Sequence, residues 1–379
     1  MTFKRYDPIV PIDIGLTQGL SSAFFTVVAT RLGAVPLLVG IIASSPYVGN
    51  LLAPLWSFLT QRHEIKKVLA MAIFLASAVL VVVAVMRTPL LFTLAIVAYF
   101  VFFGAWDVLY PALLDSIYSQ VAVGVLARFD QLRSIAYTLI VIFSGYVMGA
   151  SGHRTTFIIA AVSLMLSGVV ILQSKTEAAS SDDLEKATVA SIIREDSHIR
   201  RLVLIFMLAG TGMLMMLPAL PVVEVKTLNL SDASIGILLA VNSLAYIIAM
   251  EIWPRVVRNV AALFVTFSVG LAAIAVMALL YGFFPTYALL IVANVFCGIG
   301  GSSISFFWQT FSISHPDYRT EDLSSLHLFT CGVRGVYAPL LGALIIALLG
   351  VKMNFVLSAG VVLIGLLLFL IKGRDVFPV

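Results

Sequence analysis

The sequence is poor in charged residues and in cysteine. Only 11% of its 379 residues are charged and 61% are hydrophobic, whereas soluble domains average about 25% charged and about 45–50% apolar residues. This deficit excludes an ordinary water-soluble fold, because too few polar side chains exist to cover its surface. The two cysteines, Cys297 and Cys331, lie in apolar runs, so we interpret them as small packing residues and exclude a disulfide framework.

Metal-binding, nucleic-acid-binding and catalytic patterns are also missing. The five histidines are scattered without metal-ligand spacing, so we expect no metal and no cofactor. The net charge of +4 comes without basic clusters interleaved with aromatic residues, so we expect no nucleic-acid partner. Because the chain has no Gly-x-Ser-x-Gly elbow and no other catalytic constellation, we expect no enzymatic activity.

Long apolar blocks fill most of the chain. Each is about 20 residues long, the length needed to cross ~30 Å of hydrocarbon, and each is continuously apolar, which excludes a β-barrel. The sequence therefore predicts an all-α polytopic membrane protein with twelve transmembrane helices. The predicted spans are Ile9–Thr30, Val35–Leu59, Val68–Met86, Leu90–Ala112, Leu132–Gly149, Thr155–Leu172, Leu202–Val222, Ser234–Trp253, Val260–Tyr281, Tyr287–Phe307, Leu326–Leu349 and Asn354–Ile371.

One long polar stretch, Gln173–Arg201, separates the first six predicted spans from the last six. We therefore predict an N-terminal six-helix bundle at 1–173, a linker at 174–201 and a C-terminal six-helix bundle at 202–379. Acidic residues crowd the start of Ser181–Glu195, which is typical of a helix N-terminus. We expect a surface helix there.

The distribution of basic residues predicts the orientation, because Lys and Arg are retained in the cytoplasm. With the amino terminus inside, seventeen basic residues fall on the cytoplasmic side. Five fall on the opposite side: Arg31, Arg87, Arg154, Lys226 and Lys352. Both termini and the linker are therefore expected in the cytoplasm, and the protein in the cell (inner or plasma) membrane.

The two halves share short similarities at a nearly constant offset. Gly40-Ile-Ile-Ala is followed about 195 residues later by Gly236-Ile-Leu-Leu, and Gly104 by Gly298. A shared offset predicts the parallel duplication of a six-helix unit.

The loop after the second span reads Ser57-Phe-Leu-Thr-Gln61-Arg62-His63-Glu64-Ile65-Lys66-Lys67. With six plus six spans and a long middle loop, it resembles the major facilitator superfamily of secondary transporters, over essentially the whole chain. That family has a Gly, an Asp-Arg pair four residues on, and then a Gly and a basic pair. Arg62 and the pair Lys66-Lys67 fit this pattern. Gln61 stands where the family has an Asp that helps to lock the two halves, so we expect a differently built lock.

The resemblance implies a substrate cavity between the halves, lined mainly by spans one, four, seven and ten, and alternating access by rocking of one half on the other. It also implies a cytoplasmic gate. We place this gate on charged residues near the inner ends of the spans: Arg62, Lys66, Lys67, Asp115, Arg133 and Glu251. Glu251 also lies four residues before Arg255, the spacing of an intrahelical ion pair.

Two ionisable residues are predicted at membrane depth, where a charge must face a cavity or a partner. Arg334 lies ten residues beyond Ser324, about 15 Å along the helix, and is a candidate site for an anionic group of the substrate. The alternative is a fixed structural ion pair. Asp107 lies eight residues before Asp115 and is a candidate carrier of a coupling proton or a partner of Arg334. Its alternative is a polar helix residue beside a kink at Pro111.

Six further side chains are assigned to the substrate and ion pathway. Gln18 could face the cavity from the first span. Asn294 is a single amide, which more often joins helices than binds ligands, but it lies on a span that the resemblance assigns to the substrate. Four aromatic residues could line the cavity, although packing or interfacial anchoring is the commoner role: Trp106, Tyr110, Trp308 and Tyr337.

The sequence thus favours a secondary active transporter of a small organic solute, coupled to protons, and acting as a monomer in the lipid bilayer. One alternative is an exporter of amphipathic drugs. Gly145, Gly149 and Gly152 match that exporter class's glycine-and-proline pattern only in part. The other alternative is a membrane protein that binds a lipid or a partner without transport.

Overall fold

In the computed structural model, residues 8–60, 62–118, 122–174, 189–314, 318 and 320–372 are described, and within them all regular structure is helical. The chain divides into two compact units. The first comprises Met1–Asp182 and Asn229–Ala240, and the second comprises Asp183–Leu228 and Val241–Val379. This division differs from the predicted boundaries because the segment Asn229–Ala240 belongs with the first unit.

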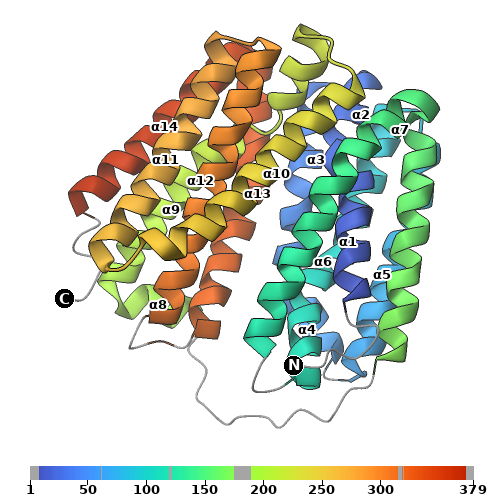
Figure 1. The fold of residues 1–379 in the computed structure, drawn as a ribbon, viewed down its shortest axis with the longest axis horizontal. Helices are drawn as coiled ribbons and strands as arrows, with labels where there is room; N and C mark the ends of the chain where they lie inside the picture. Colours follow the sequence, from blue (N-terminus) through green and yellow to red (C-terminus); the bar gives the residue numbers. More distant parts are fainter. Residues whose placement is uncertain are drawn as a thin grey trace. The chain divides into compact units, whose positions relative to one another are not determined.

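The first unit is built from helices that correspond to the first six predicted spans, coloured blue to green in Figure 1. Its elements are α1 (Ile9–Leu20), η1 (Ser22–Phe24), α2 (Phe25–Arg31), α3 (Pro36–Leu51), α4 (Ala53–Thr60), α5 (Ile65–Val85), α6 (Pro89–Tyr118), α7 (Ala122–Gln173) and the start of α10 (Asp232–Val256). Helix α7 packs on both α1 and α5, and α6 packs on α3 and α5.

Helix α7 contains two predicted spans in one helical segment of 52 residues. At Gly152 the backbone takes φ 79° and ψ 165°, a conformation that glycine adopts at little cost, and the chain reverses direction there (Figure 1). Eleven helices in the described residues are long and apolar enough to cross a membrane. Because one of them reverses direction, they account for the twelve predicted passes.

Small residues let the helices of the first unit approach closely, as is typical of membrane bundles. A Cβ atom on Gly49 of α3 would lie 2.9 Å from the Cα of Gly104 on α6. The Ser77 hydroxyl on α5 donates a 2.7 Å hydrogen bond to the carbonyl of Ala161 on α7. Gly104 is one of the residues that the predicted repeat pairs with Gly298. Gly298 is equally crowded by the backbone carbonyl of Asn242 on α10.

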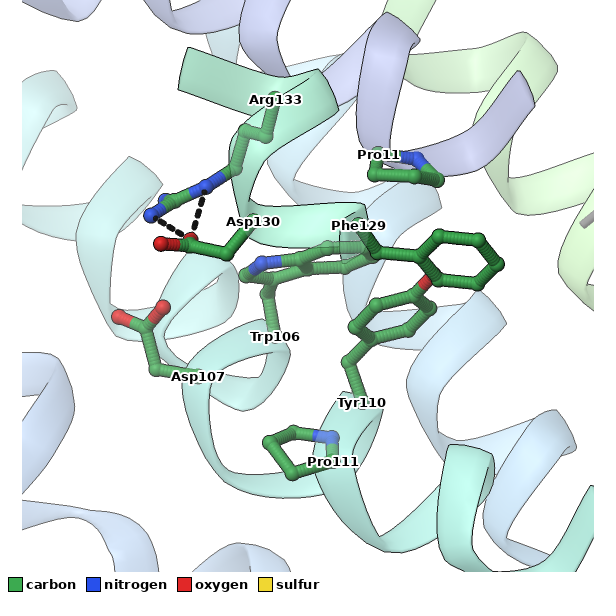
Figure 2. Close-up of a pocket in the computed structure, with 8 residues that line it drawn as sticks. All are labelled: Pro11, Trp106, Asp107, Tyr110, Pro111, Phe129, Asp130 and Arg133. Atoms are coloured by element: carbon green, nitrogen blue, oxygen red, sulfur yellow. Dashed lines mark hydrogen bonds and ion pairs between the residues drawn. The ribbon is translucent and has the colours of Figure 1, made fainter. Parts of the chain in front are cut away.

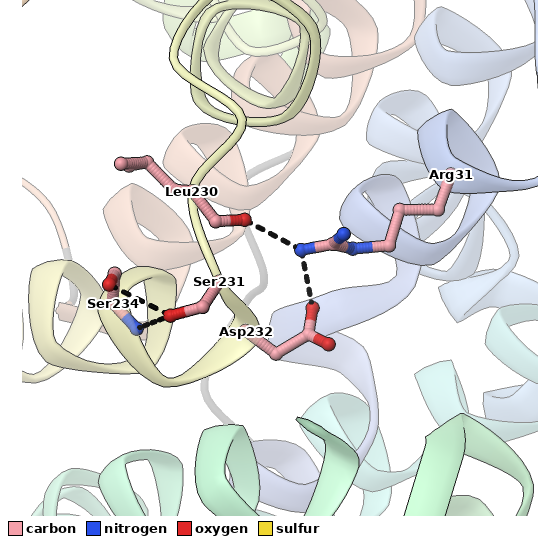
Figure 3. Close-up of polar contacts among 5 residues, drawn as sticks. All are labelled: Arg31, Leu230, Ser231, Asp232 and Ser234. Carbon is pink, nitrogen blue, oxygen red and sulfur yellow. Dashed lines mark hydrogen bonds and ion pairs between the residues drawn. The ribbon is translucent and has the colours of Figure 1, made fainter. Parts of the chain in front are cut away.

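The start of α10 is fixed to α2 by an ion pair (Figure 3). Arg31 Nη2 lies 3.0 Å from Asp232 Oδ1 and donates a 2.8 Å hydrogen bond to the carbonyl of Leu230. Both charges suit their helices, since Arg31 lies in the last turn of α2 and Asp232 in the first turn of α10. The Ser231 hydroxyl accepts a 3.1 Å hydrogen bond from the Ser234 amide and caps α10. Gly145 of α7 leaves room for this start, because its Cβ would meet the Asp232 carbonyl at 2.5 Å.

The second unit comprises α8 (Val189–Glu195), α9 (Ser197–Met215), η3 (Val222–Thr227), the remainder of α10, α11 (Val260–Phe283), α12 (Tyr287–Ser314), α13 (Thr320–Leu349) and α14 (Val351–Lys372). Helix α8 covers the end of the predicted surface helix, of which residues 181–188 lie outside the described part. The Asp196 carboxylate caps α9 by accepting hydrogen bonds of 2.7 Å and 3.0 Å from the amides of His198 and Ile199.

The seventh predicted span was placed too far along the chain. Helix α9 ends at Met215 rather than at Val222, and a turn leads into the π-helical segment η3. Pro218 and Pro221 lie in this stretch, and proline cannot continue an α-helix ladder. The buried side chain of Asn354 donates 3.1 Å hydrogen bonds to the carbonyls of Met215 and Gly342, so the end of α9 is satisfied by α14.

Candidate functional site

The first unit contains a pocket of about 120 Å³, formed by α6 and the starts of α1 and α7 (Figure 2). Its lining combines proline, aromatic and charged side chains: Pro11, Trp106, Asp107, Tyr110, Pro111, Phe129, Asp130 and Arg133.

A charged cluster forms one wall of this pocket. Arg133 lies 2.6 Å from Asp130 through Nη2, and its Nε donates a 3.0 Å hydrogen bond to the same oxygen. Its remaining terminal nitrogen donates a 3.4 Å hydrogen bond to Gln18 Oε1 on α1. Figure 2 shows the carboxylate of Asp107 beneath this ion pair. The Asp107 side chain is exposed at this pocket.

An aromatic stack forms the other wall. Trp106 and Tyr110, one helical turn apart on α6, have ring centroids 3.8 Å apart and planes 17° from parallel. Both residues are buried, with 4% and 6% of their surface exposed. A flat apolar face beside a charged cluster suits an amphipathic solute, because the two parts of such a molecule need different surroundings.

The structure therefore brings together several residues that the sequence assigned to two different tasks. Asp107, Trp106 and Tyr110, which the sequence analysis assigned to the pathway, line one pocket. Arg133 was predicted as a gate residue, yet it lines the same pocket and holds Gln18. Their joint position depends on how α1, α6 and α7 pack, which the sequence does not reveal.

Arg334 is buried in the middle of α13, with 8% of its surface exposed. Its Nη1 donates a 2.6 Å hydrogen bond to the carbonyl of Phe206, and its Nη2 donates a 3.0 Å bond to Cys331 Sγ. Gly210 on α9 makes this position possible, because a Cβ there would lie 2.6 Å from the guanidinium. Among the described residues of the second unit, no carboxylate forms an ion pair with Arg334.

A small, mostly apolar pocket adjoins this guanidinium, lined by Phe206, Ala209, Gly210, Met213, Phe267, Leu271, Ile274, Ile304 and Arg334. Two of the four predicted aromatic residues, Tyr337 and Trp308, lie in this unit. Tyr337, one turn beyond Arg334, is half-exposed and shares a 2.5 Å hydrogen bond with the Thr211 hydroxyl of α9. Trp308 is buried and stacks on His327, with ring centroids 4.5 Å apart.

Glu224 was missed by the sequence reasoning. It lies in η3, is 7% exposed, and accepts a 3.0 Å hydrogen bond from the Tyr281 hydroxyl. Asn294, predicted as a pathway residue, donates hydrogen bonds of 2.9 Å to that hydroxyl and to the Leu290 carbonyl. Burial raises the pKa of Glu224 to about 7, although the Tyr281 hydrogen bond acts in the opposite direction. The signal that the sequence offered is the pair Pro218 and Pro221, which marks the end of α9 before this carboxyl group.

Three predicted gate residues, Arg62, Lys66 and Lys67, lie around the α4–α5 loop. Lys67 and Lys66 lie 2.8 Å and 3.8 Å from the carboxylate of Glu64. Arg62 lies over the Phe58 ring, 5.0 Å from its centroid. The Lys67 hydrogen bond lowers the pKa of Glu64 below its usual value.

Two gate residues remain. In the second unit, Glu251 lies 3.8 Å from Arg255 on the same turn of α10, which confirms the intrahelical ion pair. The side chain of Asp115 lies outside the described residues, as does Gln61.

Comparisons with known proteins agree on the fold. The sequence model of the Major Facilitator Superfamily matches residues 12–332. A search of curated proteins finds no sequence match. Among solved structures, the nucleoside transporter NupG superimposes with a TM-score of 0.76 at 13% identity, covering 98% of this chain and 100% of that one.

Two other structures are similar to a comparable degree. A bacterial homologue of the human lysosomal transporter Spinster, in an inward-facing and unoccupied conformation, gives a TM-score of 0.75 at 13% identity, with 98% of both chains covered. A POT family transporter in complex with 5-aminolevulinic acid gives a TM-score of 0.74 at 12% identity, covering 98% of this chain and 96% of that one. At such identities the similarity shows the fold alone.

Proposed function

Because the chain belongs to the Major Facilitator Superfamily, we propose that it is a secondary active transporter of a small organic solute, working by alternating access and coupled to protons. The twelve helical passes and the similarity to solute transporters of several kinds support this proposal. The basic-residue distribution supports an orientation with both termini in the cytoplasm.

The solute carries an anionic group, and Arg334 binds it. The observation behind this assignment is a buried guanidinium whose two described partners, the Phe206 carbonyl and Cys331 Sγ, carry no full charge. A buried arginine cannot lose its charge and is stabilised strongly by a carboxylate or phosphate. In the described part of the second unit, no residue supplies a carboxylate to Arg334. This observation weakens the alternative that Arg334 forms a fixed structural ion pair, and it favours an anionic ligand as the counter-ion.

Asp107 remains the candidate carrier of the coupling proton in the first unit. Its carboxylate lines the pocket together with Arg133 and Asp130. A second carboxylate and a guanidinium so close have opposite effects on proton binding. A small movement of Arg133 would therefore change whether Asp107 holds a proton.

A thermal-shift screen of the purified protein tests the proposal. Candidate organic anions and lipophilic cations are added to the wild type, to Arg334→Gln and to the control Arg255→Gln, whose arginine forms an exposed surface pair. A ligand that binds the folded state raises the melting temperature. We expect at least one anion to stabilise the wild type and the control but not Arg334→Gln.

Other outcomes of this screen separate the alternatives. Stabilisation by lipophilic cations alone would favour an exporter of amphipathic compounds. An anion that stabilises all three proteins equally would remove Arg334 from the site. No stabilisation by any compound would favour a membrane protein that does not transport solutes.

A further inference from the structure

Glu224 is a buried carboxyl group in the described second unit. Only 7% of its surface is exposed, and it lies in the π-helical segment η3, between the spans Ser197–Met215 and Asp232–Val256. π-Helical turns are rare and are frequently found at functional sites. A carboxylate in such a place must find a counter-charge or bind a proton, because an uncompensated buried charge is very costly.

The partners of Glu224 are neutral. The Tyr281 hydroxyl of α11 donates a 3.0 Å hydrogen bond to Oε1 and accepts a 2.9 Å bond from the Asn294 amide of α12. Asn294 is fixed in turn by its 2.9 Å bond to the Leu290 carbonyl. In the described part of the chain, the second carboxyl oxygen, Oε2, makes no hydrogen bond and is free to carry a proton.

The charged groups near this cluster point elsewhere. Lys226, two residues along η3, is exposed. Lys352 of α14 lies over the ring of Phe283, 4.6 Å from its centroid. Cys297, one turn beyond Asn294, accepts a 3.3 Å hydrogen bond from Asn242. Among the described residues no basic side chain forms an ion pair with Glu224.

We propose that Glu224, Tyr281 and Asn294 form a proton-binding site, in which Glu224 carries a coupling proton in one access state and releases it in another. This proposal deepens the proposed transport function and rests on it for the coupling. On release the carboxyl O–H bond breaks, the proton passes to water, and the carboxylate keeps the hydrogen bond from Tyr281. Burial sets the pKa of Glu224 at about 7, so the group can change state near neutral pH.

The segment between α9 and η3 supplies a way to change the surroundings of Glu224. The backbone between Met215 and η3 contains Pro218 and Pro221, so it lacks the continuous ladder that would make it rigid. Asn354 holds the end of α9 through the Met215 carbonyl. A shift of η3 that admits water would lower the pKa of Glu224 and release the proton.

Infrared difference spectroscopy of the purified, full-length protein tests the site without any knowledge of the solute. The carbonyl stretch of a protonated carboxyl group is followed from about pH 5 to about pH 9, a window that spans the raised pKa of Glu224. We expect a band in the wild type that disappears with a midpoint near 7. This band should be absent in Glu224→Gln and present in the control Glu251→Gln, which removes an exposed carboxylate.

The Gln substitution keeps an oxygen that can accept from Tyr281, so Glu224→Gln is expected to fold, and its melting temperature checks this. The proposal would be overturned if Glu224→Gln showed the same carbonyl-band titration as the wild type. It would also be overturned if Glu224 were ionised over the whole pH range of the experiment. Such a failure leaves the anion screen on Arg334 unaffected. Conversely, failure of that screen would leave this titration standing as evidence for a proton site.

Coupling is tested in proteoliposomes once an anion has been found. We expect Glu224→Gln to exchange the anion across the membrane at equal pH on both sides but to lose accumulation driven by a proton gradient. Accumulation equal to that of the wild type would overturn the coupling role.

Discussion

The hydroxyl of Tyr281 donates a 3.0 Å hydrogen bond to Glu224 Oε1. This bond stabilises the charged carboxylate, whereas the burial of Glu224 stabilises the protonated form. Burial has the larger effect, and it raises the pKa of Glu224 to about 7. The pair thus sets how readily the carboxyl group binds a proton, and each contribution can be removed separately.

Replacing Tyr281 by Phe should raise the pKa of Glu224 further. A hydrogen bond to a charged group contributes about 1.5–3 kcal/mol, so we expect an upward shift of about one to two pH units. The infrared titration of Tyr281→Phe measures this shift against the wild type. A midpoint that falls would show that the hydroxyl stabilises the protonated form instead.

The stability of the protein should depend on pH through Glu224. The folded-state pKa lies above the unfolded value, so the folded protein binds the extra proton. The resulting stabilisation is fully present below the unfolded pKa of about 4.5 and is lost as pH rises through about 7. The wild type should therefore lose about 3 kcal/mol relative to Glu224→Gln over this range.

Paired thermal melts in the same buffers measure that difference. Comparison with Glu224→Gln removes the contributions of the other titrating groups. Parallel pH profiles for the two proteins would contradict the raised pKa.

Asp107→Asn should separate solute exchange from proton-driven accumulation. The amide keeps the shape of the side chain beside Arg133 but binds no proton. We expect reconstituted Asp107→Asn to exchange labelled solute at equal pH. Under a proton gradient, the solute concentration inside the proteoliposomes should rise only to its equilibrium level. Wild-type accumulation in this variant would remove Asp107 from the coupling mechanism.

Gly210→Ala should weaken anion binding without touching a charge. The added Cβ would lie 2.6 Å from the Arg334 guanidinium. The guanidinium must then move away from its position against α9. We expect a loss of at least about tenfold in affinity, or about 1.4 kcal/mol, measured by anion titration in the thermal-shift assay. Gly360→Ala is the matched control, because a Cβ there meets no atom within 4 Å.

Much of the helical architecture was predictable because apolar length and polar interruptions are local properties. The last span was predicted at Asn354–Ile371, and the helix α14 covers Val351–Lys372. Spans five and six were predicted on either side of Gly152, where the structure reverses the chain.

What the sequence did not reveal depends on contacts between helices. The end of α9 at Met215 is held by Asn354, which lies 139 residues away in the chain. Glu224 lies two residues beyond the predicted seventh span, and the sequence analysis gave it no role. The sequence analysis assigned Arg133 to the gate and Asp107 to the pathway, because only the packing of α1, α6 and α7 brings the two residues to one pocket. Arg334 was predicted as a charge at membrane depth, and its close packing against Gly210 became visible only in the structure.

Uptake into proteoliposomes tests the central claim most directly. Wild type, Arg334→Gln and Arg255→Gln are reconstituted at equal density, and accumulation of the labelled anion found in the screen is followed under an imposed proton gradient. We predict that the wild type and Arg255→Gln accumulate the anion above its equilibrium level and that Arg334→Gln does not. Accumulation by Arg334→Gln at the wild-type rate and level would contradict the account.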